Sequence, residues 1–276
     1  MEPQNYVDWM AEIDRRPDPN EVAEVIRLVC GGPDHQRMLA ALFDRVPLAP
    51  GQRVLEVGCG TGEAARLLAR RTGCRNPIVG VDPSATVLNV ARGMTREEHL
   101  EEILDFRQMD GRALGFAGDT FSFTYCARVL QHARAPLAVL AEMARITAPG
   151  GTVLAVEQDL GGCFEAGIPD DLYRRCFQDT NPTLARELPF HFRRLGLEVL
   201  DVVPAVWVLR QPRAPVADLR ADYQRQRGTV WPRVAAGIVS PPEAEAYFAA
   251  LERAVAEGRF LRVTLNLATL GRKPGP

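Results

Sequence analysis

The chain has 276 residues, of which 46% are hydrophobic and 25% charged, enough for one well-packed α/β domain with an added helical cap. Its net charge of -2 excludes a global positive field that would attract nucleic acid or an anionic membrane surface. No segment approaches the roughly 20 apolar residues that cross a bilayer, and the N-terminus lacks the basic and apolar parts of a secretion signal. We therefore expect a cytoplasmic protein that acts on a small molecule, with no nucleic acid as partner.

The six cysteines show neither a C-x-x-C pair nor a histidine at the spacing of a zinc site. They are also sparse for a chain of this length, which argues against a disulfide framework. We therefore expect reduced thiols and no bound metal.

Residues 1–50 show a helical pattern ahead of the main domain. Apolar residues between 22 and 29 recur at helical spacing, Gly31-Gly32-Pro33 interrupts them, and a second helix follows over residues 38–43. We predict that residues 1–50 form an N-terminal helical cap segment and that residues 51–276 form the ligand-binding domain.

From residue 51 onward, short apolar strands alternate with amphipathic helices. A helix with Ser84 as its N-cap follows the second strand, and the turn Ala148–Gly151 precedes the fifth. Alternation at these lengths predicts a doubly wound, Rossmann-like, mostly parallel sheet, whose ligands bind beyond the carboxyl ends of the strands. The predicted strands lie at residues 53–57, 78–82, 105–110, 121–126 and 152–156.

The last third of the chain changes character. Leu197–Leu209 and Phe260–Gly271 have strand patterns and are expected to pair antiparallel, which completes a seven-stranded sheet with an antiparallel last strand. Between them, residues from about 211 to 258 form a helical insert, in which Ser240 and Glu243 offer a capping box. We expect this insert and the N-terminal helices to cover the substrate as a cap; the alternative is that they only pack at the periphery.

The segment Glu56-Val57-Gly58-Cys59-Gly60-Thr61-Gly62 joins a strand to a helix. Backbone N–H groups at such a helix start are unpaired and face a ligand, and glycines let that ligand come close. Gly60-x-Gly62-x-x-Ala65 also satisfies the dinucleotide fingerprint, with Asp82 twenty residues beyond Gly62, where a ribose-binding acid stands. Both interpretations place a nucleoside at this loop.

Three acidic residues favour a cationic ligand over a dinucleotide. Glu63 falls at the helix start, where a carboxylate repels a diphosphate but tolerates the ammonium and sulfonium of S-adenosylmethionine. Glu56 adds a second negative group beside the loop. Asp110, in the third strand unit, can accept a hydrogen bond from an adenine amino group while the N–H of Gly111 helps to fix the ring.

Four motifs stand at the loop and strand ends: Val54–Gly62, Gly80-Val81-Asp82, Met109-Asp110 and Val129-Leu130-Gln131-His132. Together they resemble the class I S-adenosylmethionine-dependent methyltransferases, in particular the group of ubiquinone and menaquinone C-methyltransferases and of small-molecule methyltransferases in bacterial specialised metabolism. The resemblance covers about residues 50–160. It fails at Ser122, where members of the group usually carry an acid, and this puts a conventional substrate side in doubt.

This resemblance implies roles for the residues around the loop. Glu56 and the three glycines would line the methionine part of S-adenosylmethionine, and Asp82 would hold the ribose hydroxyls. Asp110, Gly111 and Arg112 would border the adenine, and S-adenosylhomocysteine would leave as product. The complete predicted cofactor set is Glu56, Gly58, Cys59, Gly60, Thr61, Gly62, Asp82, Pro83, Asp110, Gly111, Arg112, Cys126 and Arg128.

Methyl transfer needs little acid–base machinery, because the sulfonium already activates the methyl carbon and the protein has only to align the nucleophile and exclude water. If the acceptor is a hydroxyl or a ring carbon, His132 is the candidate base, unless it only packs its loop. Glu157 and Asp159 follow the fifth strand and are candidates to bind substrate or act as base; solvated loop acids are the alternative.

The N-terminal segment supplies three further candidates, Tyr6, Trp9 and His35. They can close over the substrate and favour the sulfonium by cation–π contact, or they can simply anchor the first helix. Arg128 can neutralise an acidic substrate or pair with a carboxylate of the site.

We therefore predict an enzyme that transfers a methyl group from S-adenosylmethionine to O or C of a small, fairly apolar acceptor, as a monomer or homodimer. Three alternatives stay open. The first is an enzyme of the same fold that keeps S-adenosylmethionine while it catalyses a cyclisation or rearrangement without methyl transfer. The others are an NAD-dependent oxidoreductase and a regulator that binds S-adenosylmethionine without catalysis.

Overall fold

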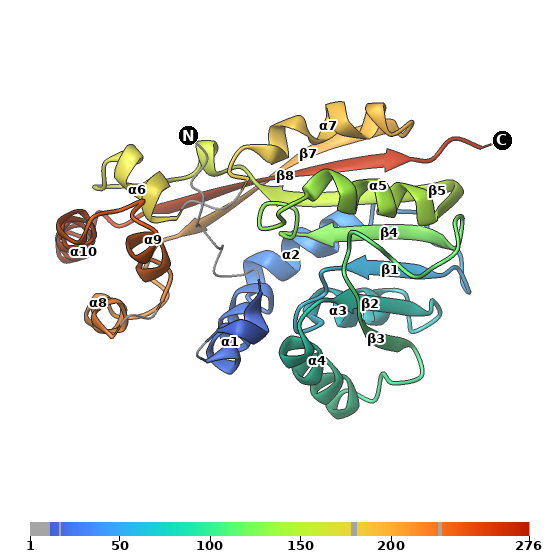
Figure 1. Cartoon of the computed structure of the whole chain (residues 1–276), viewed down its shortest axis with the longest axis horizontal. Coiled ribbons are helices and arrows are strands. Elements are labelled where there is room, and N and C mark those ends of the chain that lie inside the picture. The colour runs from blue at the N-terminus through green and yellow to red at the C-terminus, as the bar shows by residue number, and fades with distance from the viewer. Residues whose placement is uncertain (1–11, 17, 178–180, 226–227, 276) are drawn as a thin grey trace.

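The computed structural model describes residues 12–16, 18–177, 181–225 and 228–275. At its centre is a twisted sheet with helices on both faces, and a group of helices lies beyond one end of the last two strands of the chain (Figure 1). Within the described ranges, no helix combines the length and the apolar character needed to cross a bilayer.

The strands of the sheet are β1 (Val54–Val57), β2 (Ile78–Asp82), β3 (Leu104–Gln108), β4 (Phe121–Ala127), β5 (Thr147–Gln158), β6 (Phe164–Glu165), β7 (Glu198–Leu209) and β8 (Arg262–Arg272). Their order is β3-β2-β1-β4-β5-β8, and β6 and β7 both pair with β8. The first five strands are parallel, whereas β8 runs antiparallel to β5 and β7. The predicted Rossmann-like sheet with an antiparallel last strand is confirmed; the two-residue β6 was not predicted.

The helices are α1 (Pro19–Cys30), α2 (Pro33–Phe43), α3 (Glu63–Arg71), α4 (Ala85–Glu97), α5 (Pro136–Ile146), α6 (Asp170–Cys176), α7 (Leu184–Arg194), α8 (Val216–Gln224), α9 (Trp231–Ala235) and α10 (Pro241–Ala256). α2, α3 and α4 cover one face of the sheet, and α5 and α7 cover the other. Every residue of β1 and β2 is buried, as expected for central strands of a sheet covered on both faces.

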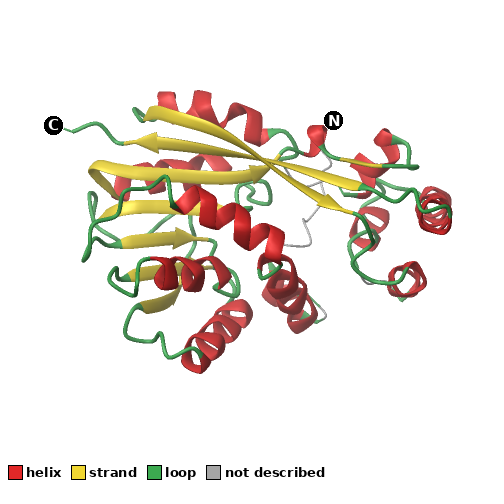
Figure 2. Cartoon of the chain, turned by 180° about the vertical axis from the view of Figure 1, so that it is seen from behind, coloured by secondary structure: helices red, strands yellow, loops and turns green. Residues whose placement is uncertain are grey.

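The helical insert predicted between β7 and β8 contains α8, α9 and α10. Ser240 and Glu243 form the predicted capping box at the start of α10, with the Glu243 carboxylate accepting the Ser240 N–H at 2.8 Å. Side chains of the insert pack with residues 160–177, which include the short helix η2 (Leu160–Gly162) and α6. Helices α6, α8, α9 and α10 gather at the far end of the long β7 and β8 (Figure 2) and share this core, whereas α1 and α2 pack elsewhere. The contribution of residues 160–177 to the cap was not predicted.

The turn predicted at Ala148–Gly151 is instead an irregular part of β5. Thr147 already pairs with Phe121 of β4, and the register shifts before regular pairing resumes at Thr152. Gly150 has a φ of +77° and donates its N–H to the carbonyl of Lys273. The sequence pattern of a turn therefore marks a bulge, which hydrogen bonds to the C-terminal segment hold in the sheet.

Candidate functional site

The carboxyl ends of the parallel strands point toward α1 and the cap helices (Figure 1). The glycine loop follows β1, Asp82 ends β2, and Arg128 and His132 follow β4. Ile26 of α1 lies over the loop, because a Cβ atom at Gly60 would be 3.2 Å from its side chain. The predicted cofactor residues therefore meet at one edge of the sheet, where α1 covers them in part.

The glycine loop places three residues in the left-handed region, with φ of +69° at Gly58, +53° at Gly60 and +80° at Gly62. A Cβ atom at Gly58 would lie 2.4 Å from Val129, and one at Gly62 would lie 2.8 Å from Phe106. Backbone conformation and packing thus both require glycine. We expected the missing Cβ atoms to leave room for a ligand, but protein side chains fill that room at Gly58 and Gly62.

Asp82 holds the loop against β2. Its Oδ2 accepts the N–H of Gly60 at 3.0 Å, and its Oδ1 accepts the N–H of Ser84 at 2.9 Å. Burial raises the pKa of Asp82 to about 6, although these two hydrogen bonds oppose the rise. Each carboxylate oxygen keeps a further lone pair, so the ionised group can accept hydrogen bonds from two neighbouring hydroxyls while it fixes the loop.

Asp14, in the short helix η1 (Ile13–Arg15), is a neighbour of Asp82 that we did not predict. Its carboxylate accepts the Ser84 hydroxyl at 2.6 Å and the Ala85 N–H at 2.7 Å, and so caps the start of α4. No local motif signals this contact, because 70 positions separate Asp14 from Ser84 in the sequence.

Glu56 is buried at the end of β1, and Tyr125 of β4 donates its hydroxyl to Glu56 Oε2 at 3.1 Å. Burial raises the pKa of Glu56 to about 8, and the hydrogen bond from Tyr125 opposes the rise. A cation beside this carboxyl would favour its ionised form. The partnership with Tyr125 was not predicted, because it depends on the pairing of β1 with β4.

Glu63 does not act as we expected from its position at the helix start. It is buried, its carboxylate lies 3.2 Å from Arg66, and it accepts the Thr61 hydroxyl at 2.6 Å. Its charge is therefore already matched and does not by itself exclude a diphosphate. Sheet topology makes the distinction instead, because the dinucleotide fold continues with parallel strands where this chain has the antiparallel β8.

The predicted adenine side is more open. Asp110 and Arg112 are exposed and form an ion pair, in which Arg112 Nη2 lies 2.5 Å from Asp110 Oδ2. The hydrogen bond from Arg112 lowers the pKa of Asp110 despite some burial. Gly111 packs beside Val57 and Val139, at 3.1 and 3.2 Å from the position of a Cβ atom. An adenine amino group would have to share Asp110 with Arg112, and exposed pairs of this kind are weak enough to be shared.

Two cysteines of the predicted cofactor set, Cys59 and Cys126, are buried. Burial raises the pKa of both thiols well above the usual value. Both are therefore neutral at physiological pH and lack the thiolate that a nucleophile needs. Pro83 contributes its carbonyl, which accepts the side-chain N–H of Gln108 at 2.9 Å.

Glu157, a predicted substrate residue, lies buried beneath the loop after β4. Its carboxylate accepts the N–H groups of Val129 at 3.2 Å, Leu130 at 2.9 Å and Gln131 at 3.1 Å. Burial raises its pKa, and these hydrogen bonds oppose the rise. The geometry gives Glu157 a positioning role, since it fixes the segment that carries Arg128 and His132.

Of the other predicted substrate residues, Asp159 and His35 are buried among protein groups. Asp159 is buried, and both of its oxygens lie 2.9 Å from Nε of Arg186. His35 is buried beside Trp207, with 5.4 Å between the ring centres. Its Nδ1 lies 2.9 Å from the Cys30 carbonyl. Tyr6 and Trp9 lie outside the described residues.

His132 is half-buried at the end of the loop that Glu157 holds. Its N–H donates to the Val129 carbonyl at 3.0 Å, and its Nε2 lies 3.1 Å from Gln131 Nε2. The backbone position of His132 is therefore fixed at the edge where an acceptor would lie, as a base requires.

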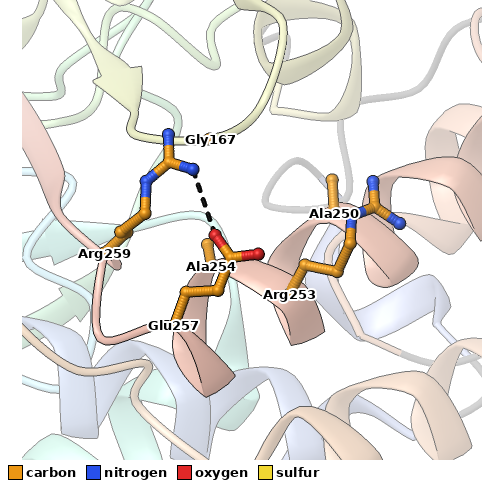
Figure 3. Close-up of a pocket in the computed structure, with 6 residues that line it drawn as sticks. All are labelled: Gly167, Ala250, Arg253, Ala254, Glu257 and Arg259. Atoms are coloured by element: carbon orange, nitrogen blue, oxygen red, sulfur yellow. Dashed lines mark hydrogen bonds and ion pairs between the residues drawn. The ribbon is translucent and has the colours of Figure 1, made fainter.

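The cavity drawn in Figure 3 lies away from these residues. It has a volume of about 120 Å³ and is lined by the end of α10 and by Gly167, Glu257 and Arg259. Glu257 and Arg259 pair with each other at 3.0 Å. None of the predicted site residues lines it, and over the described part of the chain no three potential ligands come together to hold a metal ion.

Residues 55–155 match the methyltransferase domain family. The chain is 34% identical over 169 residues to Methyltransferase GfsG of Streptomyces halstedii, which covers 60% of each protein. It is 30% identical over 134 residues to the demethylmenaquinone methyltransferase of Halalkalibacterium halodurans, which covers 49% of this chain and 54% of the relative. The matched segments thus span less than two thirds of either relative.

Among solved structures, the cyclase SpnF is similar with a TM-score of 0.61 and 24% identity, which covers 88% of this chain and 82% of SpnF. This likeness concerns the fold alone. The matched residues 55–155 contain the glycine loop, Asp82 and the loop after β4. This part of the chain is therefore a methyltransferase domain of the class I S-adenosylmethionine-dependent family.

Proposed function

We propose that the protein binds S-adenosylmethionine at the carboxyl ends of β1, β2 and β4 and transfers its methyl group to O or C of a small molecule. The observation that carries this proposal is the pair of buried carboxyls, Glu56 and Asp82, on either side of the glycine loop. Asp82 would hold the ribose hydroxyls, and Glu56 would face the cationic methionine end. Asp110 to Arg112 would border the adenine.

Bound S-adenosylmethionine supplies a methyl carbon that is already activated by the sulfonium. The remaining tasks of the chain are to hold the acceptor in line with that carbon and to exclude water. α1 lies over the glycine loop through Ile26, and we propose that residues 1–50 and the insert at about 211–258 together cover the site. Glu157 accepts hydrogen bonds from the loop after β4, and Asp159 is bound to Arg186. Neither acid is therefore free to act as a base, which agrees with catalysis by alignment of the acceptor.

Similarity to a demethylmenaquinone methyltransferase supports a small-molecule acceptor. The role in bacterial specialised metabolism is part of our proposal and is supported by the sequence resemblance. The cyclase SpnF has the same fold, so a cyclisation or rearrangement without methyl transfer is the second candidate. Methyl transfer adds one methyl group to the mass of the product, whereas a cyclisation or rearrangement leaves the mass unchanged.

The test is incubation of the protein with S-adenosylmethionine that carries a deuterated methyl group and a panel of phenols and quinols. We expect a product that gains one labelled methyl group, together with S-adenosylhomocysteine, by mass spectrometry. Conversion of a panel member without a change in mass supports the cyclisation and contradicts methyl transfer.

His132→Ala is expected to lower kcat about 100-fold, because it removes the candidate base at the acceptor edge. The affinity for S-adenosylhomocysteine should stay within about twofold of the wild type, since loss of a base alters the chemical step alone. His99→Asn is the matched control, because His99 is exposed with a φ of +55°, which asparagine tolerates. Unchanged kcat in His132→Ala assigns this residue to loop packing.

Binding of S-adenosylmethionine is expected to release a proton from Glu56. Since its pKa is raised to about 8, the free carboxyl is mostly neutral near pH 7, and a nearby cation lowers that pKa. Affinity should therefore rise as the pH rises through about 8 and level off above it, where Glu56 is already ionised before binding. Calorimetry in two buffers of different ionisation enthalpy measures the released proton. Equal proton release in the wild type and in Glu56→Gln contradicts this role of Glu56.

A further inference from the structure

A second group of polar side chains lies on the α2 face of the sheet and comes from β5, β8, β7, α2 and the loop after β4. Asn266 of β8 pairs in register with Gln158 on one side and with Ala205 on the other. Trp207 of β7 is two residues along from Ala205 and so points to the same face. Arg128 lies over the Trp207 ring, with its guanidinium carbon 5.4 Å from the ring centre.

This group contains buried polar atoms that lack a hydrogen-bond partner among the described residues. They are Nε2 of His35, Nε of Arg128, Nε1 of Trp207 and Oδ1 of Asn266. The exposed fraction is 3% for His35, 5% for Trp207 and 0% for Asn266. More than 90% of buried polar groups in native proteins have a partner, so four unpaired atoms around one tryptophan indicate that a ligand supplies the missing bonds.

The unpaired atoms differ in what they need. Trp207 Nε1 and Arg128 Nε can only donate hydrogen bonds. His35 uses its Nδ1–H on the Cys30 carbonyl, which leaves Nε2 as a bare acceptor. Burial and then the charge of Arg128 lower the pKa of His35 to about 4, so this ring stays neutral. The ligand must therefore carry both an oxygen acceptor and a hydrogen-bond donor.

The arginines near this group indicate that the oxygen acceptor of the ligand is an anion. Arg213 follows β7 and reaches solvent, and no acid within the described chain forms an ion pair with it or with Arg128. Surrounding protein atoms and then the charges of Arg128 and Arg262 lower the pKa of Arg213 to about 10. Arg262 already has a partner, since it lies 2.7 Å from Glu165. Arg128 and Arg213 thus repel each other, and an anion between them would relieve that repulsion.

Sheet order places the Trp207 end of this group away from Asp82, whereas Arg128 follows β4 and lies between the two. β1, β4, β5 and β8 separate β2, which carries Asp82, from β7, which carries Trp207. At a strand spacing of about 4.8 Å, the two ends lie roughly 24 Å apart. A cofactor that reaches from β2 to β4 leaves Trp207 and Arg213 on the acceptor side.

We propose that the methyl acceptor is an acid, whose carboxylate or phosphate group binds to Arg128, Arg213 and the indole N–H of Trp207. A donor on the same molecule binds to His35 Nε2 and Asn266 Oδ1. This assignment rests on the proposed methyltransferase function, and it revises the expectation of a fairly apolar acceptor.

The test uses simple aromatic probes on the full-length protein, by calorimetry with and without S-adenosylhomocysteine. Benzoate and phenyl phosphate carry the anion, and benzamide is the neutral control of similar shape. The wild type should bind at least one of the two acids about tenfold more tightly than benzamide, the size of one charge-assisted hydrogen bond. Whichever acid is preferred identifies the carboxylate or the phosphate as the natural group.

Arg213→Gln should abolish this preference and leave the affinity for S-adenosylhomocysteine unchanged. Arg210→Gln, an equal loss of charge at an exposed position three residues away, should keep it. Trp207→Phe should weaken binding of the acids more than binding of benzamide. Equal affinity for acids and amide in the wild type, or no binding of any probe, overturns the proposal.

Loss of S-adenosylhomocysteine affinity in Arg213→Gln also overturns it, because the arginines would then serve the carboxylate of the cofactor. A wild type that prefers acids but never binds S-adenosylhomocysteine refutes the proposed function and leaves the anion site standing.

Discussion

Asp82→Ala is expected to weaken the binding of S-adenosylhomocysteine by at least about 100-fold, because hydrogen bonds to a charged group contribute about 1.5–3 kcal/mol each and two ribose hydroxyls lose their acceptor. The variant also removes the 3.0 Å contact that fixes the N–H of Gly60. The loop is then free to leave the conformation that faces the ligand. Isothermal titration calorimetry measures the loss.

Two further variants serve as controls for this result. Asp82→Asn keeps one oxygen at the same place and should lose less affinity than Asp82→Ala. Asp105→Ala, on the neighbouring β3, removes an exposed carboxylate that pairs with Arg107 at 2.7 Å, and should leave affinity unchanged. Wild-type affinity in Asp82→Ala contradicts the placement of the nucleoside at β2.

Glu157→Ala is expected to lower the free energy of unfolding by about 3 kcal/mol, because a buried N–H group left without a partner costs about 1–3 kcal/mol. Three N–H groups, those of Val129, Leu130 and Gln131, lose their acceptor together. The buried carboxylate itself carries a desolvation cost, which offsets part of the loss. Urea unfolding followed by circular dichroism measures the difference.

The same carboxylate holds the loop that carries His132, the candidate base, so we expect the effect to reach activity. Glu157→Gln keeps Oε1 for Val129 and Leu130 but turns an amide toward the N–H of Gln131, and it should fall between alanine and wild type. Glu198→Ala, which breaks only an exposed pair with Arg272, should cost less than about 1 kcal/mol. If Glu157→Ala is as stable as Glu198→Ala, the loop after β4 does not depend on this carboxylate.

Local patterns predicted those parts of the fold that depend on near neighbours in sequence. The capping box at Ser240, the N-cap at Ser84 and the glycine loop all formed where the pattern placed them. Residues 160–177 joined the cap core through contacts with α10, a pairing that no local pattern can show. The bulge at Gly150 had the composition of a turn, and only its hydrogen bonds to the C-terminal segment distinguish the two.

In the site, too, features set by near neighbours in sequence could be predicted, and long-range contacts could not. The sequence placed Glu56, Asp82 and His132 at one edge, because each follows or ends a parallel strand. It could not give their surroundings, because Tyr125 reaches Glu56 through the pairing of β1 with β4, and Asp14 binds Ser84 beside Asp82 from 70 positions away.

The acidic residues of the sequence were the least reliable basis for predicting the site. Glu63 and Asp159 appeared in the sequence as free acids, but each meets an arginine in the structure. Trp207 lay in a strand with no motif around it, and only the pairing of β7 with β8 brings it to Arg128 and His35.

Calorimetric titration of the wild-type protein with S-adenosylhomocysteine, and separately with NADH, tests the central claim most directly. We expect saturable heat with S-adenosylhomocysteine and none with NADH, because the proposal places the buried acid Glu56 toward the ammonium group of the ligand, and NADH has no such group. Tight binding of NADH without any binding of S-adenosylhomocysteine would contradict the account.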